Sequence, residues 1–426
     1  MKKLAFALGT GLFTAATVVG IAQMPSLAEH EAIAYSKAEA TDAVAKLQTK
    51  LDAGEATLDY DDAHGYLPAV LRALNVPVSS QGLVFSRTSL QVDHIAPWTP
   101  RAVYFNDSVY VGWVQGGPIM EVASVDPKLG AVFYTLNQEK TAHPSFERQT
   151  HTCLQCHDSS SSTGGVPGFI MRSVVTDRYG YPVASGAGAT TDQTPLEDRW
   201  GGWYVTGTMG NLPHKGNVFA PVLSHEMGNA QSYLARTKLV SNGDVESLAA
   251  RFDTEPYLAP HSDAVALLLL AHQAVVHNLI TLANFEARKA AYTGGADGAA
   301  TATVTAAADR LARAMLFVKA ARFTAPVKGT STFAADFSAR GPRDRHGRSL
   351  RDLDLEHRLF KYPLSYLIYS EGFDALPPVV KDRVYARLRE VLTGKDPSPD
   401  FAHLSEEDRK AILEILADTK PDFLRS

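Results

Sequence analysis

Both cysteines of the chain fall in one pentapeptide, Cys153-Leu154-Gln155-Cys156-His157. Two thiols at positions i and i+3 can reach the two vinyl groups of one porphyrin, and the histidine that follows can turn its imidazole onto the iron. The motif therefore predicts a single, covalently bound haem c, with Cys153 and Cys156 as the thioether anchors and His157 as the proximal ligand. Because both thiols are then used, no disulfide is left to stabilise the fold, and packing has to do so.

Other uses of a Cys-x-x-Cys pair fit this sequence less well. A zinc half-site needs a second pair of ligands, and the chain has no other cysteine to form a second Cys-x-x-Cys. A thioredoxin-like dithiol lies between a buried strand and a helix, whereas polar residues at 149–152 and 158–162 flank this motif. A redox-active or structural dithiol is the alternative to haem c.

The N-terminus has the pattern of an export signal. Two lysines precede an apolar core at residues 4–23, and Ser26-Leu27-Ala28 is a small-x-small cleavage site. We expect residues 1–28 to be a signal peptide, the mature chain to begin near Glu29, and the protein to be periplasmic or secreted. An uncleaved membrane anchor is the alternative, because the apolar core is almost long enough to span a bilayer.

The composition is that of an ordinary globular protein. Hydrophobic residues make up 45% of the 426 residues and the net charge is −5, so the charge gives no reason to expect binding to nucleic acid or to an anionic membrane. The most apolar later stretch, residues 264–270, is soon followed by His272 and His277. We therefore expect no membrane span in the mature chain.

The first half of the chain changes from helical to extended patterns. Residues 35–53 are rich in helix formers, and residues 61–74 carry leucine and valine at helical spacing. From 82 to 136, β-branched and aromatic residues alternate with turn residues, which predicts a meander of antiparallel strands. We expect further strands at 168–175 and 202–206, so that strands flank the Cys-x-x-Cys-His motif on both sides.

The second half of the chain reads as helical. Ser262 is the expected N-cap of a long helix over 263–292, and Ser405 begins a capping box with Asp408. The other expected helices cover 299–321, 359–369, 379–392 and 405–417. The predicted fold class is α+β, with an antiparallel, haem-attaching region at 29–235 followed by a mainly helical region at 236–426. The sequence leaves open whether the two regions share one core.

The motif resembles that of the small c-type cytochromes, and one downstream loop adds to the likeness. The loop at 207–214 is punctuated by glycine and proline and carries Met209 at its tip. In that family a loop methionine is the distal iron ligand, so the resemblance implies Met209 as the second metal ligand beside His157. His214 is the next candidate, then His272 or His277, and an open distal position is the remaining alternative.

Two further segments, 199–207 and 358–369, resemble stretches of large bacterial proteins described as cytochrome c domain-containing. This resemblance implies haem binding and electron transfer with a redox partner protein or a small electron donor or acceptor. We therefore expect a periplasmic monohaem cytochrome. The alternative is a haem c enzyme, for instance a peroxidase-like one, in which a histidine acts as acid and base over an open iron. The length of the chain favours the enzyme, and its single attachment motif counts against a dihaem peroxidase.

Overall fold

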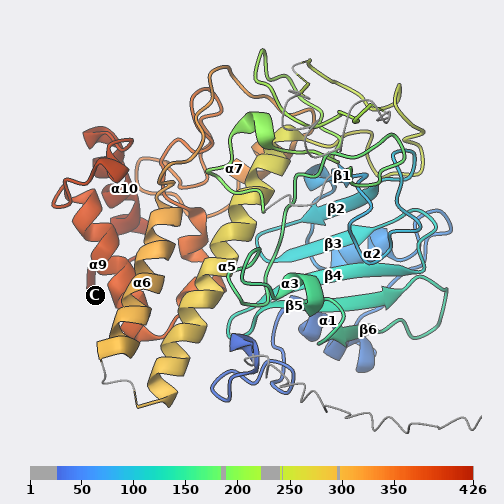
Figure 1. Ribbon diagram of the computed structural model, residues 1–426. Helices are drawn as coiled ribbons and strands as arrows, with labels where there is room; N and C mark the ends of the chain where they lie inside the picture. The colour runs from blue at the N-terminus through green and yellow to red at the C-terminus, as the bar shows by residue number, and fades with distance from the viewer. Residues whose placement is uncertain (1–25, 184–188, 222–239, 242, 295–297, 426) are drawn as a thin grey trace, which may run out of the picture.

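The computed structural model describes residues 26–183, 189–221, 240–241, 243–294 and 298–425. A six-stranded antiparallel sheet forms one side of the molecule, and most of the helices pack beside it (Figure 1). The α+β fold class predicted from the sequence is therefore confirmed. Most of the expected signal peptide, residues 1–25, lies outside the described residues.

The sheet is a simple meander. Its strands pair in sequence order, each antiparallel to the next, as the pattern over 82–136 predicts. The tight turn between the fourth and fifth strands is held by Asp126, whose Oδ1 accepts from the backbone N of Lys128 at 2.7 Å and of Leu129 at 2.9 Å. The strands are β1 (Gly82–Val84), β2 (Arg101–Phe105), β3 (Val109–Trp113), β4 (Ile119–Asp126), β5 (Gly130–Asn137) and β6 (Phe146–Gln149).

Each face of the sheet buries a different set of side chains because successive residues of a strand point to opposite faces. On one face, residues such as Met120 and Val122 join a core cluster with the N-terminal helices α1 (Ala43–Asp52) and α2 (Leu67–Ala73). Both helices are shorter than the sequence indicated. Helix α1 begins only at Ala43 because Asp42 caps it, accepting from the backbone N of Val44 at 2.8 Å.

The other face of the sheet packs against α5 (Ala264–Tyr292), a long helix that is buried over most of its surface. Its N-cap is Asp263 and not Ser262, because Oδ1 of Asp263 accepts from the backbone N of Val265 at 2.8 Å. The hydroxyl of Ser262 is bound elsewhere, donating to the carbonyl of Tyr204 at 2.7 Å. Among the described residues, α5 is the one helix long and apolar enough to cross a membrane, and 89% of that apolar window is buried inside the protein.

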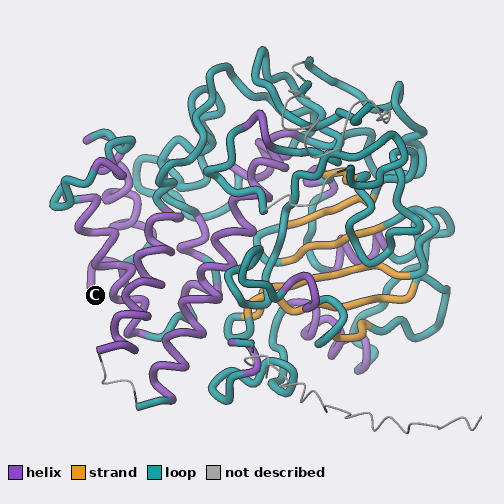
Figure 2. Tube along the Cα trace, in the orientation of Figure 1, coloured by secondary structure: helices purple, strands orange, loops and turns teal. Residues whose placement is uncertain are grey.

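Most of the helices that follow α5 in the chain gather on one side of it (Figure 2). The expected helices at 379–392 and 405–417 are present, and Ser405 forms the predicted capping box with Asp408. The prediction of a helix at 359–369 is wrong, since only a short 3₁₀ turn forms there. The longer elements are α6 (Gly298–Met315), α7 (Phe333–Ser338), α9 (Pro378–Leu392) and α10 (Glu406–Thr419). The short ones are α3 (Leu154–His157), α8 (Glu371–Asp374), α11 (Asp422–Arg425), η1 (Leu27–Glu29), η2 (Val78–Ser80), η3 (Leu196–Asp198), η5 (Tyr366–Tyr369) and η6 (Pro399–Phe401).

The strands expected at 168–175 and 202–206 do not form. These segments make only isolated bridges, such as the one between Val84 and Trp203. Left-handed backbone at Trp200 (φ 68°) and Gly202 (φ 78°) turns the chain away from an extended path. Strands therefore precede the Cys-x-x-Cys-His motif, and none follows it among the described residues. The core is nevertheless shared, because one buried cluster includes side chains from the sheet, α5 and α9.

Candidate haem site

A cavity of about 350 Å³ lies over the face of the sheet that packs against α5, and the Cys-x-x-Cys-His motif forms part of its wall. This volume is within the range of small-molecule sites. Strands β2 to β5 supply one side, the segment 169–172 another, and α5 closes the cavity with Leu270 and Ala274. Most of the wall is apolar, with Val103, Tyr110, Phe133, Phe169, Trp203 and Leu270 among its residues.

The motif itself forms a single helical turn, α3 (Leu154–His157), soon after β6 ends. The backbone N of His157 donates to the carbonyl of Cys153 at 3.0 Å, which closes the turn. Positions i and i+3 of a helical turn lie on the same side, and both cysteines line the cavity as unpaired thiols. Burial raises the pKa of the Cys153 thiol to about 11, so this cysteine remains protonated at neutral pH.

The imidazole of His157 is held in one orientation by Gly168. Its Nδ1 lies 2.8 Å from the carbonyl oxygen of Gly168, and the backbone N of Gly168 donates to the carbonyl of His157 at 2.9 Å. A carbonyl can only accept, so Nδ1 carries the proton and Nε2 keeps its lone pair. Burial, together with the nearby Arg101 and Arg172, lowers the pKa of His157 against the opposing effect of the Gly168 bond. The ring is therefore neutral, which is the form that binds a metal.

Helix α5 fixes the segment that orients this histidine. The side-chain amide of Asn278 accepts from the backbone N of Phe169 at 2.8 Å and donates to the carbonyl of Phe169 at 2.9 Å. Gly168 has to be a glycine, because a Cβ at this position would overlap the Asn278 side chain. Sequence reasoning did not identify Gly168 or Asn278 because their roles depend on contacts with residues far away in the chain.

Two arginines bring positive charge to the cavity. Arg101 lies across Gly112, where a Cβ would collide with its guanidinium, and forms an ion pair with Glu121. Its Nε is buried and has no hydrogen-bond partner within the described residues. Arg172 also lines the cavity, and its side chain makes no hydrogen bond or ion pair with any described residue. These unmatched donors are suited to the carboxylates of an anionic ligand.

The available donors fit haem c better than a zinc site. Two free thiols, an imidazole with Nε2 available, apolar walls and arginines with unmatched donors are the groups that a covalently bound porphyrin with two propionates requires. Over the described ranges, no group of three or more histidine, cysteine, aspartate or glutamate side chains is placed to hold a metal ion. A zinc site built from the motif therefore has no further ligands in the described part of the chain.

The structure does not bring Met209 to this cavity. Met209 is buried in the core, and its backbone N donates to Oδ1 of Asp244 at 2.9 Å. The next residue back, Thr208, donates its backbone N to the carbonyl of Lys328 at 2.9 Å, which ties the loop to the helical half. Met209 as the distal ligand stays a prediction, and the geometry gives it no support.

The three histidines considered as distal ligands also lie outside the wall of the cavity. Nδ1 of His214 accepts from the backbone N of Gly216 at 3.0 Å, and burial lowers the pKa of His214 to about 4. Both ring nitrogens of His272 have polar partners within 2.8 Å. His277 lies behind the wall, where its Nε2 is 2.9 Å from the carbonyl oxygen of Asp107. The described methionine that lines the cavity is Met171.

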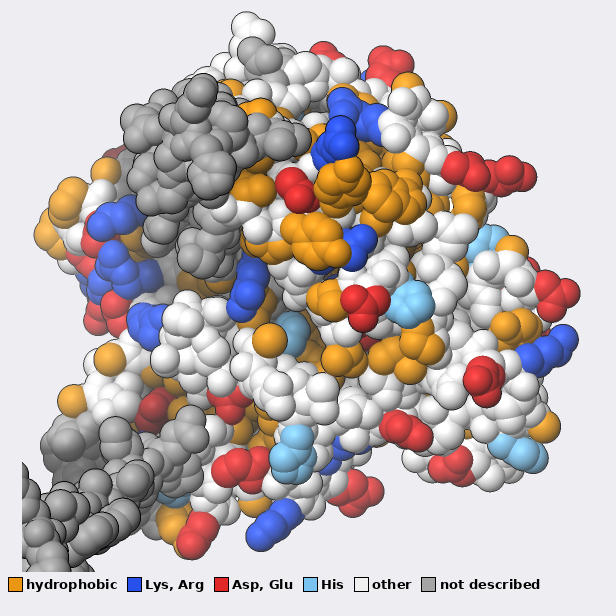
Figure 3. Space-filling view, turned by 45° about the vertical axis from the view of Figure 1, so that its right-hand side comes forward, with side chains coloured by type: hydrophobic (Ala, Val, Ile, Leu, Met, Phe, Trp, Pro, Cys, Tyr) orange, Lys and Arg blue, Asp and Glu red, His pale blue; other side chains and the backbone are white. Residues whose placement is uncertain are grey.

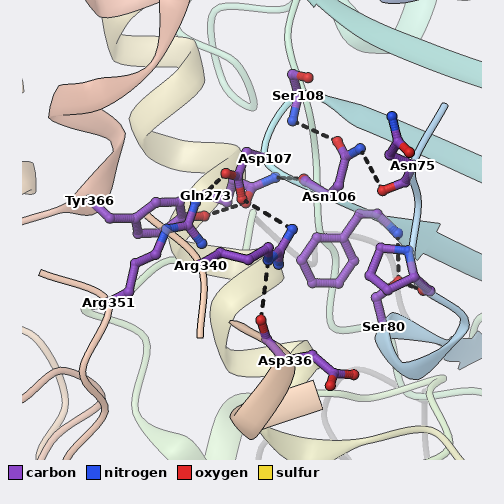
Figure 4. A network of polar contacts seen from close by, with 12 residues as sticks. Asn75, Ser80, Asn106, Asp107, Ser108, Gln273, Asp336, Arg340, Arg351 and Tyr366 are labelled. Atoms are coloured by element: carbon purple, nitrogen blue, oxygen red, sulfur yellow. Dashed lines mark hydrogen bonds and ion pairs between the residues drawn. The ribbon is translucent and has the colours of Figure 1, made fainter. Parts of the chain in front are cut away.

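A polar network around Asp107, Gln273 and Tyr366 (Figure 4) reaches the wall of the cavity at Tyr110. The hydroxyl of Tyr110 accepts from Nε2 of Gln273 at 2.7 Å, and Oε1 of Gln273 accepts from the hydroxyl of Tyr366. The guanidinium of Arg351 stacks on Tyr366, 4.4 Å from the ring centroid, and pairs with Asp107. The bond from Gln273 holds the hydroxyl of Tyr110 in place, while Nη1 of Arg351 is buried without a hydrogen-bond partner among the described residues.

Several large hydrophobic side chains are exposed, one of them at the cavity. Leu90, which lines it, is 51% exposed, and the exposed rings of Trp98 and Tyr179 lie edge to face. Figure 3 brings the sheet side of the molecule forward and shows hydrophobic side chains gathered on that face, with lysine and arginine among them.

Comparisons of this chain with protein-family models, with curated proteins and with solved structures found no match.

Proposed function

We propose that this cavity binds one haem c through Cys153, Cys156 and His157, and that the protein transfers electrons as a monohaem cytochrome outside the cytoplasm. The observation that carries the proposal is the bond from Nδ1 of His157 to the carbonyl of Gly168, at 2.8 Å. It leaves Nε2 available beside two unpaired thiols in an apolar cavity. When bound, a haem supplies a one-electron iron couple whose potential the protein adjusts.

The residues around the motif perform three tasks in this proposal. The aromatic and aliphatic wall, including Phe133 and Trp203, keeps water away from the metal. Arg101 and Arg172 would hold the propionates, and Arg172, which has no carboxylate partner among the described residues, would favour the reduced state because a nearby positive charge stabilises added negative charge. The carbonyl of Gly168 makes His157 a better electron donor by accepting its Nδ1 proton.

Covalent attachment is the first test. Protein matured in a host with complete haem-attachment machinery should keep its haem through acid-acetone extraction, and its intact mass should exceed that of the mature chain by one haem. The double variant Cys153→Ala with Cys156→Ala should lose that added mass. His157→Ala should keep covalent haem but change the spectrum of the iron. Wild-type protein without covalent haem under these conditions would overturn the proposal.

Met171 is the methionine that the cavity offers as a distal ligand, and Met209 is the matched comparison elsewhere in the core. A thioether ligand favours ferrous iron. Met171→Ala should therefore lower the potential, abolish the weak far-red band of methionine-bound ferric haem and let cyanide bind. Met209→Ala should leave the spectrum unchanged. If Met209→Ala changed the spectrum and Met171→Ala did not, Met209 would be the distal ligand, as the sequence predicts.

A haem enzyme with an open distal position is the second candidate. The observation that favours it is that Met209, His214, His272 and His277 are all absent from the described wall of the cavity. In that case the ion pair of Arg101 and Glu121, which lines the cavity, would supply the polar groups for acid and base chemistry. Wild-type protein that binds carbon monoxide readily when reduced, with no band from a sulfur ligand, would favour the enzyme over the electron carrier.

Export is the remaining part of the proposal. The carbonyl of Ala28 accepts from the backbone N of Tyr35 at 3.0 Å, and cleavage after Ala28 would remove that bond. It would leave Glu29 as the first residue, which accepts from the Ser36 hydroxyl at 2.8 Å. N-terminal sequencing of protein from the native host should begin at or near Glu29. An intact Met1 in the membrane fraction would contradict the proposed export.

A further inference from the structure

A second cavity, of about 510 Å³, lies on the opposite side of α5 from the candidate haem site. Leu268 lines this second cavity, whereas Leu270 and Ala274 line the first. Residues two positions apart on a helix point in nearly opposite directions. The other walls come from segments around 317–323 and 354–363, so this cavity is separate from the Cys-x-x-Cys-His motif.

Every carboxylate on the wall of the second cavity already has a cation or histidine partner. Oδ2 of Asp192 lies 2.7 Å from Nδ1 of His272. Asp354 lies 3.7 Å from Arg358, and Asp400 lies 2.6 Å from Arg313. Each of these carboxylates therefore already has a polar or charged partner within the protein.

The positive charges of this wall are only partly compensated. Arg322 lines the cavity and makes no hydrogen bond or ion pair with any described residue. Arg199 is 3% exposed, and it donates from Nε to the carbonyl of Thr194 and from Nη2 to the carbonyl of Asp192, both at 2.8 Å. Its Nη1 makes no hydrogen bond with any described residue. Both Arg199 and Arg322 therefore line the cavity with donors that lack an acceptor among the described residues.

Burial destabilises the charged guanidinium of Arg199, and a bound anion would offset this loss of solvation. Desolvation lowers the pKa of its guanidinium against the opposing effect of the nearby Asp192 carboxylate, which also contacts His272. A buried charge is stabilised by a bidentate partner of opposite sign. The unpartnered Nη1 is the position at which such a partner is missing.

The rest of the wall is apolar and held in a fixed conformation. Phe317, Phe323 and Phe360 line the cavity. The backbone at Phe317 (φ 56°) and at Lys319 (φ 61°) is left-handed, which is costly for residues other than glycine. The segment stays in place because the carbonyl of Asp192 accepts from the backbone N of Ala321 at 2.8 Å. The same carbonyl binds Arg199, so the aromatic wall and the buried cation are positioned together.

We propose that this second cavity binds a small aromatic carboxylate, with its carboxylate at Arg199 and Arg322 and its ring against the phenylalanine wall. An inorganic anion would leave the apolar wall without a partner, and a neutral aromatic molecule would leave both guanidinium groups without one. The cavity volume accommodates a ligand of this size. This binding site does not depend on whether the first cavity holds haem.

The test is calorimetric titration of the mature full-length protein with benzoate, benzyl alcohol and inorganic phosphate. Benzoate should bind at millimolar concentration or below, and the other two should bind at least about tenfold more weakly, a difference of about 1.4 kcal/mol. Phosphate binding as tightly as benzoate would overturn the aromatic part of the proposal. Absence of benzoate binding would overturn all of it.

Matched variants locate the site. Arg322→Gln should weaken benzoate binding about tenfold, and it should leave the fold intact because the side chain is exposed and unpaired among the described residues. Arg310→Gln makes the same change of charge on an exposed face of α6, away from the cavity, and should leave binding unchanged. Equal effects of the two variants would show a general charge effect and overturn the assignment. Phe360→Ala should weaken benzoate binding without creating phosphate binding.

Discussion

Replacing Asn278 by alanine tests whether α5 holds the segment that orients His157. The Asn278 amide makes two bonds with the backbone of Phe169, at 2.8 and 2.9 Å. Both are buried, and Gly168, one residue earlier, accepts from Nδ1 of His157. Removal of the amide therefore affects the fold and the orientation of the imidazole together.

The expected loss of stability follows from the groups left without partners. Asn278→Ala leaves the backbone N and carbonyl of Phe169 buried and unpaired, and each such group costs about 1–3 kcal/mol. The variant should lose about 2–5 kcal/mol of unfolding free energy, a large share of the roughly 5–15 kcal/mol that a typical domain has. Urea unfolding followed by far-ultraviolet circular dichroism measures this loss.

Asn284 provides the matched control on the same helix. It is also buried, but its side-chain bonds to Pro127 and Ala375 are both at 3.5 Å, the limit of a hydrogen bond. Asn284→Ala should therefore lose less than about 1 kcal/mol. Asn278→Ala should also shift the potential of the bound haem, and Asn284→Ala should not. Equal losses of stability in the two variants, or an unchanged potential in Asn278→Ala, would refute the reasoning.

Two further predictions concern pH and helix capping. The pKa of His214 is about 4 in the folded chain, against a usual 6.5. Between pH 6.5 and pH 4 the unfolded chain therefore binds a proton at this residue that the folded chain does not bind. The stability that the neutral His214 contributes is complete above pH 6.5 and is lost as the pH falls towards 4. Between pH 7 and pH 5 the wild type should lose about 2 kcal/mol more than His214→Gln in urea unfolding, and equal losses would contradict this. Asp263→Ala removes the N-cap of α5 and the hydrogen bond of 2.8 Å from the backbone N of Ser331. This variant should lose about 1–3 kcal/mol of unfolding free energy, whereas Ser405→Ala, at the exposed cap of α10, should lose about 1 kcal/mol. Thermal unfolding measures both losses.

The sequence by itself determined the features whose chemistry lies in neighbouring residues. The Cys153–His157 motif is contiguous, so one helical turn is enough to place two thiols and an imidazole on the wall of one cavity. The meander over 82–136 follows from short alternating runs with turns between them, and each strand pairs with its neighbour in the chain. The capping box at Ser405 is equally local, since both of its bonds join residues three apart.

The tertiary structure alone decided which distant side chains meet. Met209 and Met171 both lie beyond the motif, and nothing in their local sequence says that Met171 lines the cavity while Met209 is tied to Asp244. The choice of Asp263 over Ser262 as N-cap has the same origin, because Ser262 is already bound to Tyr204. A hydrogen bond or a packed contact between residues far apart in the chain depends on the path of the whole backbone. Local propensity and spacing carry no information about that path.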